Sequence, residues 1–145
     1  MTQVEIDNLL KGDLGELYFK HFCKNNNYCY IKLEDIYRTF TPEGYLIFKC
    51  GFERLTIKIH EEIENEIRTV CKPSNNDEKS PSFVFDFLTY SKEYKKFYWV
   101  EIKTGSSELR KNQENVIKLC KLPVKIFKVT SKPPEQIDIV YKNHE

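Results

Sequence analysis

The chain has 145 residues, of which 40% are hydrophobic and 31% charged, as expected for one globular domain with its own core. Its formal net charge of +1 excludes a global basic surface for nucleic acid, so such binding would need a local patch. No apolar run approaches the ~20 residues of a membrane span, so we expect no membrane contact.

The cysteines are odd in number, far apart and without C-x-x-C spacing: Cys23, Cys29, Cys50, Cys71 and Cys120. This distribution favours reduced thiols over a zinc site or a disulfide framework. The first residues also lack the basic start and apolar core of a signal peptide. We therefore expect a cytoplasmic protein.

A first helix is predicted over residues 4–24, because apolar residues recur at helical spacing between Leu10 and Phe22. Gly12 and Gly15 lie inside it, and a glycine in a helix interior costs ~1 kcal/mol relative to alanine. Close approach of the helix backbone to the sheet or to a ligand would explain them.

A short strand follows at 28–31, and after it the chain carries an insert of about residues 32–80. Within the insert we expect an unassigned segment to 41, a turn at 42–44, strands at 45–50 and 55–59, a helix at 61–71 and a polar loop at 74–80. The helix has acids in its first turns and a basic residue late, which suits the helix dipole. The insert could shape substrate choice or build a dimer surface.

A pair of strands at 81–90 and 97–105, joined by a short polar turn, is the most informative stretch. Both are rich in aromatic and β-branched residues and apolar on both faces, which predicts an antiparallel hairpin in the centre of a covered sheet. They nevertheless contain Asp86, Glu101 and Lys103. Because side chains alternate along a strand, Glu101 and Lys103 point to one face, where Asp86 can join them.

Buried charges are normally paired or bound to metal, because a lone one costs several kcal/mol. Two carboxylates beside a lysine offer oxygen ligands to a divalent cation, which can polarise a phosphoryl oxygen and activate a water. The alternative is a buried salt bridge from Asp86 or Glu101 to Lys103, without catalysis.

A further helix is predicted from Ser106 or Ser107, either of which can cap it, to about Lys121. Gln113 falls on its apolar stripe, and a glutamine on an inward face usually has a polar partner, here the backbone or a site residue. Three flanking residues either contact phosphates or form a solvated surface: Arg110, Lys111 and Asn112. Strands are expected at 124–130 and 137–141.

The Asp on one strand and the Glu-x-Lys on the next, Asp86 and Glu101-Ile102-Lys103, resemble the motif of the PD-(D/E)XK nuclease superfamily, which includes restriction enzymes and archaeal Holliday-junction resolvases. The proline that usually precedes the Asp is replaced by Phe85. Small size favours a likeness to compact archaeal or archaeal-virus members, and for a viral protein the location would be the host cytoplasm.

The resemblance implies a restriction-endonuclease-like αβββαβ core, an α/β fold whose mixed central sheet is flanked by helices. It covers residues 8–30 and 81–130, with the insert between them, in a single nuclease-like domain over 1–145. No other catalytic centre competes with it, since the three histidines have no metal-binding spacing.

The function implied is metal-dependent hydrolysis of DNA, duplex or branched, by a homodimer. Asp86, Glu101 and the carbonyl of Ile102 would ligate Mg²⁺ or Mn²⁺, and Lys103 would orient the water. Two further residues would complete the site, as they do in relatives: Glu16, which follows Gly15, and Gln113.

Three alternatives remain open at this point. Glu16 could instead be a surface residue paired with Lys20, one turn later. The protein could be a non-catalytic nucleic-acid-binding module on a degenerate nuclease fold. It could also be an interaction protein that docks a partner through the helix at 61–71, with Ile63 and Ile67 as contacts.

Overall fold

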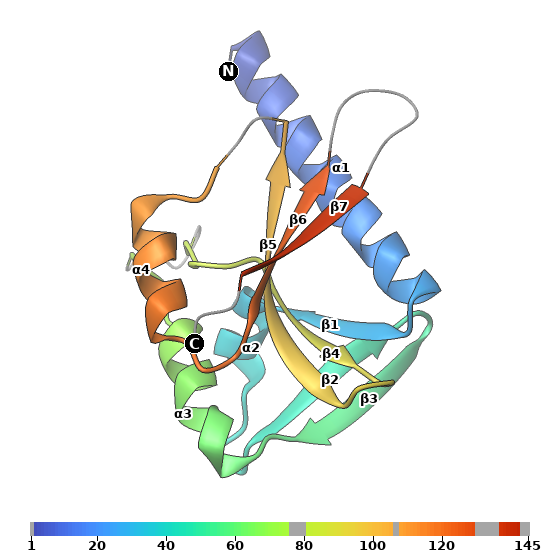
Figure 1. Cartoon of the computed structure of the whole chain (residues 1–145), viewed down its shortest axis with the longest axis vertical. Coiled ribbons are helices and arrows are strands. Elements are labelled where there is room, and N and C mark those ends of the chain that lie inside the picture. The colour runs from blue at the N-terminus through green and yellow to red at the C-terminus, as the bar shows by residue number, and fades with distance from the viewer. Residues whose placement is uncertain (1, 76–80, 106–107, 130–136, 143–145) are drawn as a thin grey trace.

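The structure is a computed structural model that describes residues 2–75, 81–105, 108–129 and 137–142. Its elements in chain order are α1 (Gln3–Asn25), β1 (Tyr28–Lys32), α2 (Leu33–Thr39), β2 (Tyr45–Cys50), β3 (Glu53–Lys58), α3 (Glu61–Val70), β4 (Phe87–Ser91), β5 (Lys96–Thr104), α4 (Lys111–Leu119), β6 (Val124–Val129) and β7 (Ile137–Lys142) (Figure 1). In the part of the chain described, no helix is long and apolar enough to cross a membrane.

All of these strands belong to one sheet of seven, in the order β3-β2-β1-β4-β5-β6-β7. Neighbouring strands are antiparallel except β5 and β6, which are parallel and are joined by α4 as the crossover helix that a parallel pair requires. The chain is therefore a mixed α/β protein, as predicted. The predicted hairpin is also confirmed, with β4 in the middle of the sheet.

Two hydrophobic cores cover the two faces of this sheet. On one face, α1 packs Phe19 and Cys23 against Phe87, Val100 and Phe127. On the other face, Ile67 of α3 and Ile117 of α4 belong to one core with Leu88 of β4 and Trp99 of β5. Burial on both faces explains why the two central strands are apolar at nearly every position.

Helix α1 approaches β5 closely at Gly15. A Cβ atom built there would lie 2.9 Å from Cγ2 of Ile102 and 3.1 Å from Cγ2 of Thr104. Both separations are shorter than ordinary van der Waals contact, so only glycine fits without a shift. This close approach to the sheet confirms the reason predicted for a glycine inside the helix.

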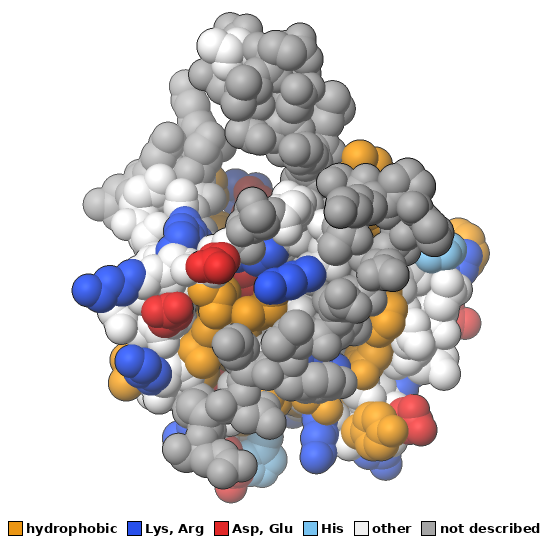
Figure 2. All heavy atoms as spheres, turned by 45° about the horizontal axis from the view of Figure 1, so that its top comes forward, with side chains coloured by type: hydrophobic (Ala, Val, Ile, Leu, Met, Phe, Trp, Pro, Cys, Tyr) orange, Lys and Arg blue, Asp and Glu red, His pale blue; other side chains and the backbone are white. Residues whose placement is uncertain are grey.

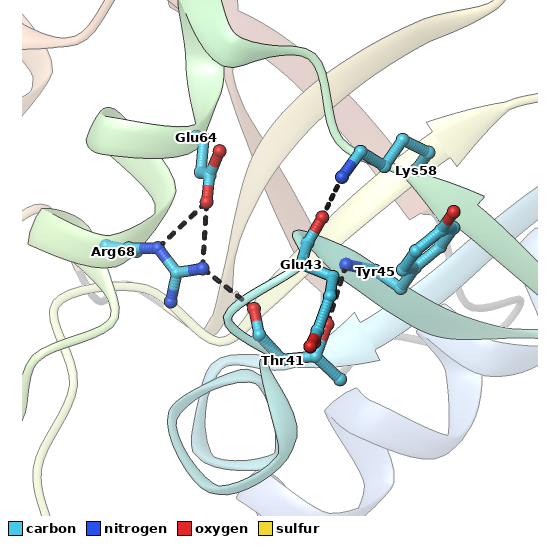
Figure 3. Close-up of polar contacts among 6 residues, drawn as sticks. All are labelled: Thr41, Glu43, Tyr45, Lys58, Glu64 and Arg68. Atoms are coloured by element: carbon cyan, nitrogen blue, oxygen red, sulfur yellow. Dashed lines mark hydrogen bonds and ion pairs between the residues drawn. The ribbon is translucent and has the colours of Figure 1, made fainter.

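The turn between α2 and β2 is held against α3 by a polar network (Figure 3). Arg68 donates from Nη2 to the Thr41 carbonyl and to Oε1 of Glu64, both at 2.8 Å. The Lys58 ammonium donates to the Glu43 carbonyl. These bonds satisfy backbone carbonyls of the turn and fix the β2–β3 hairpin relative to the helix.

Several predicted boundaries were wrong. Residues 33–39, which had no assignment, form α2, because Leu33 and Ile36 are buried by the sheet. Strand β4 starts at Phe87 rather than 81, so Asp86 lies just before it. Helix α4 starts at Lys111. The suggested caps at Ser106 and Ser107 and most of the polar loop at 74–80 lie outside the described residues.

The prediction that all cysteines are reduced was wrong for two of them. Cys29 of β1 and Cys50 of β2 form a disulfide, with their Cα atoms 4.5 Å apart. The register that pairs Tyr30 with Lys49 places the two cysteines opposite each other, which a sequence separation of 21 does not reveal. The remaining three cysteines are buried free thiols, as expected: Cys23, Cys71 and Cys120.

Candidate functional site

Asp86 lies at the point where the chain joins β4, directly across from Glu101. Its backbone N–H donates to the Val100 carbonyl at 3.0 Å, which continues the pairing of Phe87 with Val100 by one residue. Its Oδ2 accepts from the backbone N–H of Ile102 at 2.7 Å. The carboxylate of Asp86 therefore binds the backbone of β5 at the point where the β4–β5 backbone pairing ends. This hydrogen bond fixes the carboxylate beside Glu101.

The two carboxyl groups lie side by side, with Glu101 buried and Asp86 half-buried. Glu101 is 7% exposed. Burial raises its pKa to about 9, helped by the negative charge of Asp86 and by a hydrogen bond between the two carboxyls, against the cations Lys103 and Arg110. At neutral pH the pair therefore retains a proton, as close pairs of carboxyls do.

Lys103 lies on the same face, two residues along β5. Its Nζ is 4.0 Å from Oε1 of Glu101, at the outer limit of an ion pair. The ammonium therefore offsets only part of the charge of the carboxyl pair. This long contact differs from the tight buried salt bridge that was considered as an alternative. A doubly ionised pair would still carry excess negative charge.

Gln113 of α4 has no exposed surface, and its amide orients Glu101. Its Nε2 donates to Oε2 of Glu101 and, at 2.8 Å, to the carbonyl of Val84. Its Oε1 accepts from the backbone N–H of Arg110 at 2.9 Å. Because a backbone donor binds one end and a backbone acceptor the other, the amide has one orientation. The inward polar placement predicted for Gln113 is confirmed, with both a backbone and a site partner.

Glu16 is placed on the other face of the sheet. It forms an ion pair of 3.0 Å with Nζ of Lys32 on β1, and the alternative pair with Lys20 is not among the ion pairs of the described residues. Lys32 lies opposite Phe87, with its Nζ 6.0 Å from that ring, on the face that α1 covers. The structure therefore does not bring Glu16 to the carboxyl pair, which Gln113 contacts from α4.

A metal ion at this site would depend on few protein ligands. Among the described residues, no three His, Cys, Asp or Glu side chains gather closely enough to hold an ion. Asp86 and Glu101 supply two carboxylates, and any further donor would be backbone or water. Hard oxygen donors with several water ligands are the usual coordination of Mg²⁺.

The three residues predicted to contact phosphates, Arg110, Lys111 and Asn112, are all exposed at the start of α4. The positive charge of Arg110 lowers the pKa of Glu101, so its guanidinium acts on the carboxyl pair. Figure 2 shows Lys and Arg side chains on the side where α4 lies, with Asp and Glu side chains among them. The charge there is mixed, so phosphate contacts would be local.

Sequence reasoning missed a hollow of about 490 Å³ between α3 and α4, which adjoins the site at Val84 and Arg110. Its wall includes Glu66, whose Oε2 accepts from Nε1 of Trp99 at 3.1 Å and from the backbone N–H of Leu122 at 3.0 Å. These contacts attach α3 to β5 and β6. Ile67 is fully buried and so is not exposed for the docking contact considered above, whereas Ile63 is half-buried.

Comparison of the chain with family models, with curated proteins and with solved structures finds no match.

Proposed function

We propose that the protein is a metal-dependent nuclease that hydrolyses DNA phosphodiester bonds between Asp86, Glu101 and Lys103. The observation that carries the proposal is the position of Asp86 beside the buried Glu101, with Nζ of Lys103 4.0 Å from Oε1 of Glu101. The raised pKa of Glu101 agrees with it. Burying Glu101 beside a second acid opposes folding, and a divalent cation that replaces the proton on Glu101 would remove that cost. A buried acid with a raised pKa beside a second acid is typical of a functional site.

The fold supports a restriction-endonuclease-like core. The elements α1, β1, β4, β5, α4 and β6 follow the αβββαβ order, and their four strands are neighbours in the sheet. Helices α1 and α4 contribute to the cores on opposite faces. The segment α2–α3 is then an insert between the first and second core strands.

The chain's own residues fit a divalent ion. Asp86 and Glu101 would hold Mg²⁺ or Mn²⁺, with the carbonyl of Ile102 as a third ligand. Such an ion polarises a phosphoryl oxygen and lowers the pKa of a water. Glu16 would have to leave Lys32 before it could contribute.

Lys103 would orient the attacking water and stabilise the charge that develops on the phosphoryl oxygens. Gln113 is a positioning residue in this scheme, because it fixes the carboxylate of Glu101 through one hydrogen bond while both ends of its amide are bound to backbone. Arg110, Lys111 and Asn112 would bind the phosphates next to the one that is cut.

The proposed substrate is duplex or branched DNA, and the proposed assembly is a homodimer, because one chain presents one site and such DNA has two strands to cut. The proposed location is the cytoplasm, although the disulfide of Cys29 and Cys50 removes the argument from reduced thiols. Light scattering after gel filtration tests the assembly, and a monomer with full activity on duplex DNA would contradict it.

A second function, a nucleic-acid-binding module without catalysis, is favoured by the absence of a third acidic ligand near Asp86 and Glu101 among the residues described. Such a module would use the same fold and the same basic residues. It would bind DNA equally well with chelator and with Mg²⁺.

Incubation of the protein with supercoiled plasmid, linear duplex, single strand and a four-way junction separates the two functions. A nuclease cuts at least one of them with Mg²⁺ or Mn²⁺ and none with chelator. Asp86→Asn and Glu101→Gln should abolish cutting while the circular-dichroism spectrum stays unchanged. Full cutting by both variants would refute the site.

A further inference from the structure

A second basic surface lies away from the carboxyl pair, on the face of the sheet that α1 covers. It is a groove of about 500 Å³ near the strands β1, β2 and β3, and Lys20, Lys32, Lys49 and Arg54 line it together with a single acid, Asp35. Glu16 pairs with Lys32, so Lys20, Lys49 and Arg54 against Asp35 leave a local positive excess in a chain with a net charge of +1. Such a groove attracts a polyanion.

The strand register explains why these cations gather. Tyr30 pairs with Lys49, and Lys49 pairs with Arg54, so these three side chains form one row across three strands. Like charges directly opposite in a sheet destabilise it. Lys49 and Arg54 are exposed, and neither forms an ion pair in the part of the chain that the structure describes. A bound anion would neutralise this repulsion.

The groove also offers apolar contacts between its charges. Ile47, 54% exposed, and the half-buried ring of Tyr30 lie among the basic residues. Alternation of cations with apolar and aromatic surface suits a nucleic-acid strand, whose phosphates and sugars or bases alternate in the same way. A purely electrostatic anion site would not need it.

The position of the groove relates it to the site. Lys32, at the end of β1, lines the groove, and the next residue, Leu33, donates its backbone N–H to the carbonyl of Asp86 at 3.3 Å. The groove therefore begins at the end of the central strands where the carboxyl pair lies, although on the other face. A DNA strand passing the site could continue around these strand ends onto β1, β2 and β3.

We propose that this groove binds the phosphate backbone of DNA outside the point of cleavage, and that the β2–β3 hairpin of the insert extends the substrate-binding surface. The choice of DNA as the polyanion rests on the proposed function. The insert then has a defined role: it lengthens the DNA that the protein holds.

The test compares the unchanged protein with the double variant Lys49→Ala/Arg54→Ala. Binding of a fluorescent 30-bp duplex is measured by anisotropy with chelator over a series of salt concentrations. Because each lost phosphate contact reduces the slope of log K against log salt by ~0.9, the double variant should lose ~2 from the slope. Its affinity at low salt should fall at least roughly tenfold.

The matched control is Lys92→Ala/Lys96→Ala, which removes the same charge from exposed positions. These two residues lie at the turn between β4 and β5, which is the end of the β4–β5 hairpin away from Asp86. It should bind within about twofold of the unchanged protein. Equal binding and equal salt slopes for the groove variant and the unchanged protein would overturn the proposal. So would an equal loss in the control, or no DNA binding by the unchanged protein.

Cleavage separates this inference from the proposed function. If the unchanged protein cuts no DNA but the groove variant alone loses binding, the groove stands and the nuclease proposal fails. If the protein cuts DNA and the groove variant binds and cuts a long duplex normally, the groove proposal fails alone. Asp86→Asn should lose cutting and keep the binding that the groove provides.

Discussion

Gln113 of α4 donates a hydrogen bond from Nε2 to Oε2 of Glu101 on β5, and both groups are buried. This bond connects the crossover helix to the carboxyl pair. It makes the geometry of the pair dependent on a residue that would touch neither metal nor substrate.

Replacing Gln113 with methionine, which has a similar volume but no amide, should therefore destabilise the protein. The buried carboxyl of Glu101 would lose a partner, at ~1–3 kcal/mol. The backbone groups of the half-buried Val84 and the exposed Arg110 would each lose a bond at a smaller cost. Urea denaturation gives the free energy of unfolding. Asn112→Ala, at the exposed neighbouring position, is the control and should change it by less than about 0.5 kcal/mol. Equal stability of both variants would show that the amide bonds contribute nothing.

The stability of the metal-free protein should fall as pH rises. The pKa of Glu101 is raised in the folded state to about 9, from an ordinary value of 4.5, by burial and by Asp86. The folded state therefore holds a proton that the unfolded state releases, so the contribution is complete below about pH 4.5 and is lost as pH rises toward 9.

Thermal unfolding with chelator between pH 5 and pH 9 measures this effect against the variant Glu101→Gln, which cannot ionise. As pH rises, the melting temperature of the unchanged protein should fall steadily relative to that of the variant. Parallel curves for the two proteins would mean that Glu101 titrates normally.

Binding of Mg²⁺ or Mn²⁺ should release about one proton near pH 7, because the ion replaces the proton that the carboxyl pair retains. Calorimetric titrations in buffers with different ionisation enthalpies give the number of protons released. Asp86→Asn should bind the ion much more weakly. Binding without proton release would place the ion somewhere other than beside Glu101.

The disulfide should account for a large part of the stability of the insert. It closes a loop over a sequence separation of 21 between Cys29 and Cys50, for which loop-closure entropy gives about 3 kcal/mol. Reductant should lower the urea midpoint of the unchanged protein accordingly. The double variant Cys29→Ser/Cys50→Ser should unfold at a lower midpoint that reductant does not shift. An unchanged midpoint on reduction would exclude this contribution.

The central hairpin and the inward position of Gln113 could be predicted because the information is local. Aromatic and β-branched residues mark the two strands, and three charges stand out within them. The polar side chain of Gln113 interrupts an apolar stripe at helical spacing. In each case the deviation from a simple hydrophobic pattern is visible within one or two elements.

Features that depend on distant pairing could not be predicted. The partner of Glu16 is Lys32, on the strand after the helix, and nothing in the helix sequence distinguishes it from Lys20. Cys29 and Cys50 meet only because β1 and β2 are neighbours. Helix α2 has seven residues, too few for a period to be recognised.

At the close approach of α1 to β5, helix propensity and packing predict opposite signs for the change in stability when Gly15 is replaced by alanine. Gly15→Ala should gain ~1 kcal/mol from helix propensity alone. The new methyl group, however, would lie 2.9 Å from Cγ2 of Ile102 and 3.1 Å from Cγ2 of Thr104, and overpacking of this kind costs about 1–3 kcal/mol or more. We therefore expect lower stability in urea, partly restored by Thr104→Ser, which removes the second methyl. Higher stability of Gly15→Ala would mean that the helix can move away from the sheet, and that α1 does not fix the position of the strand that carries Glu101.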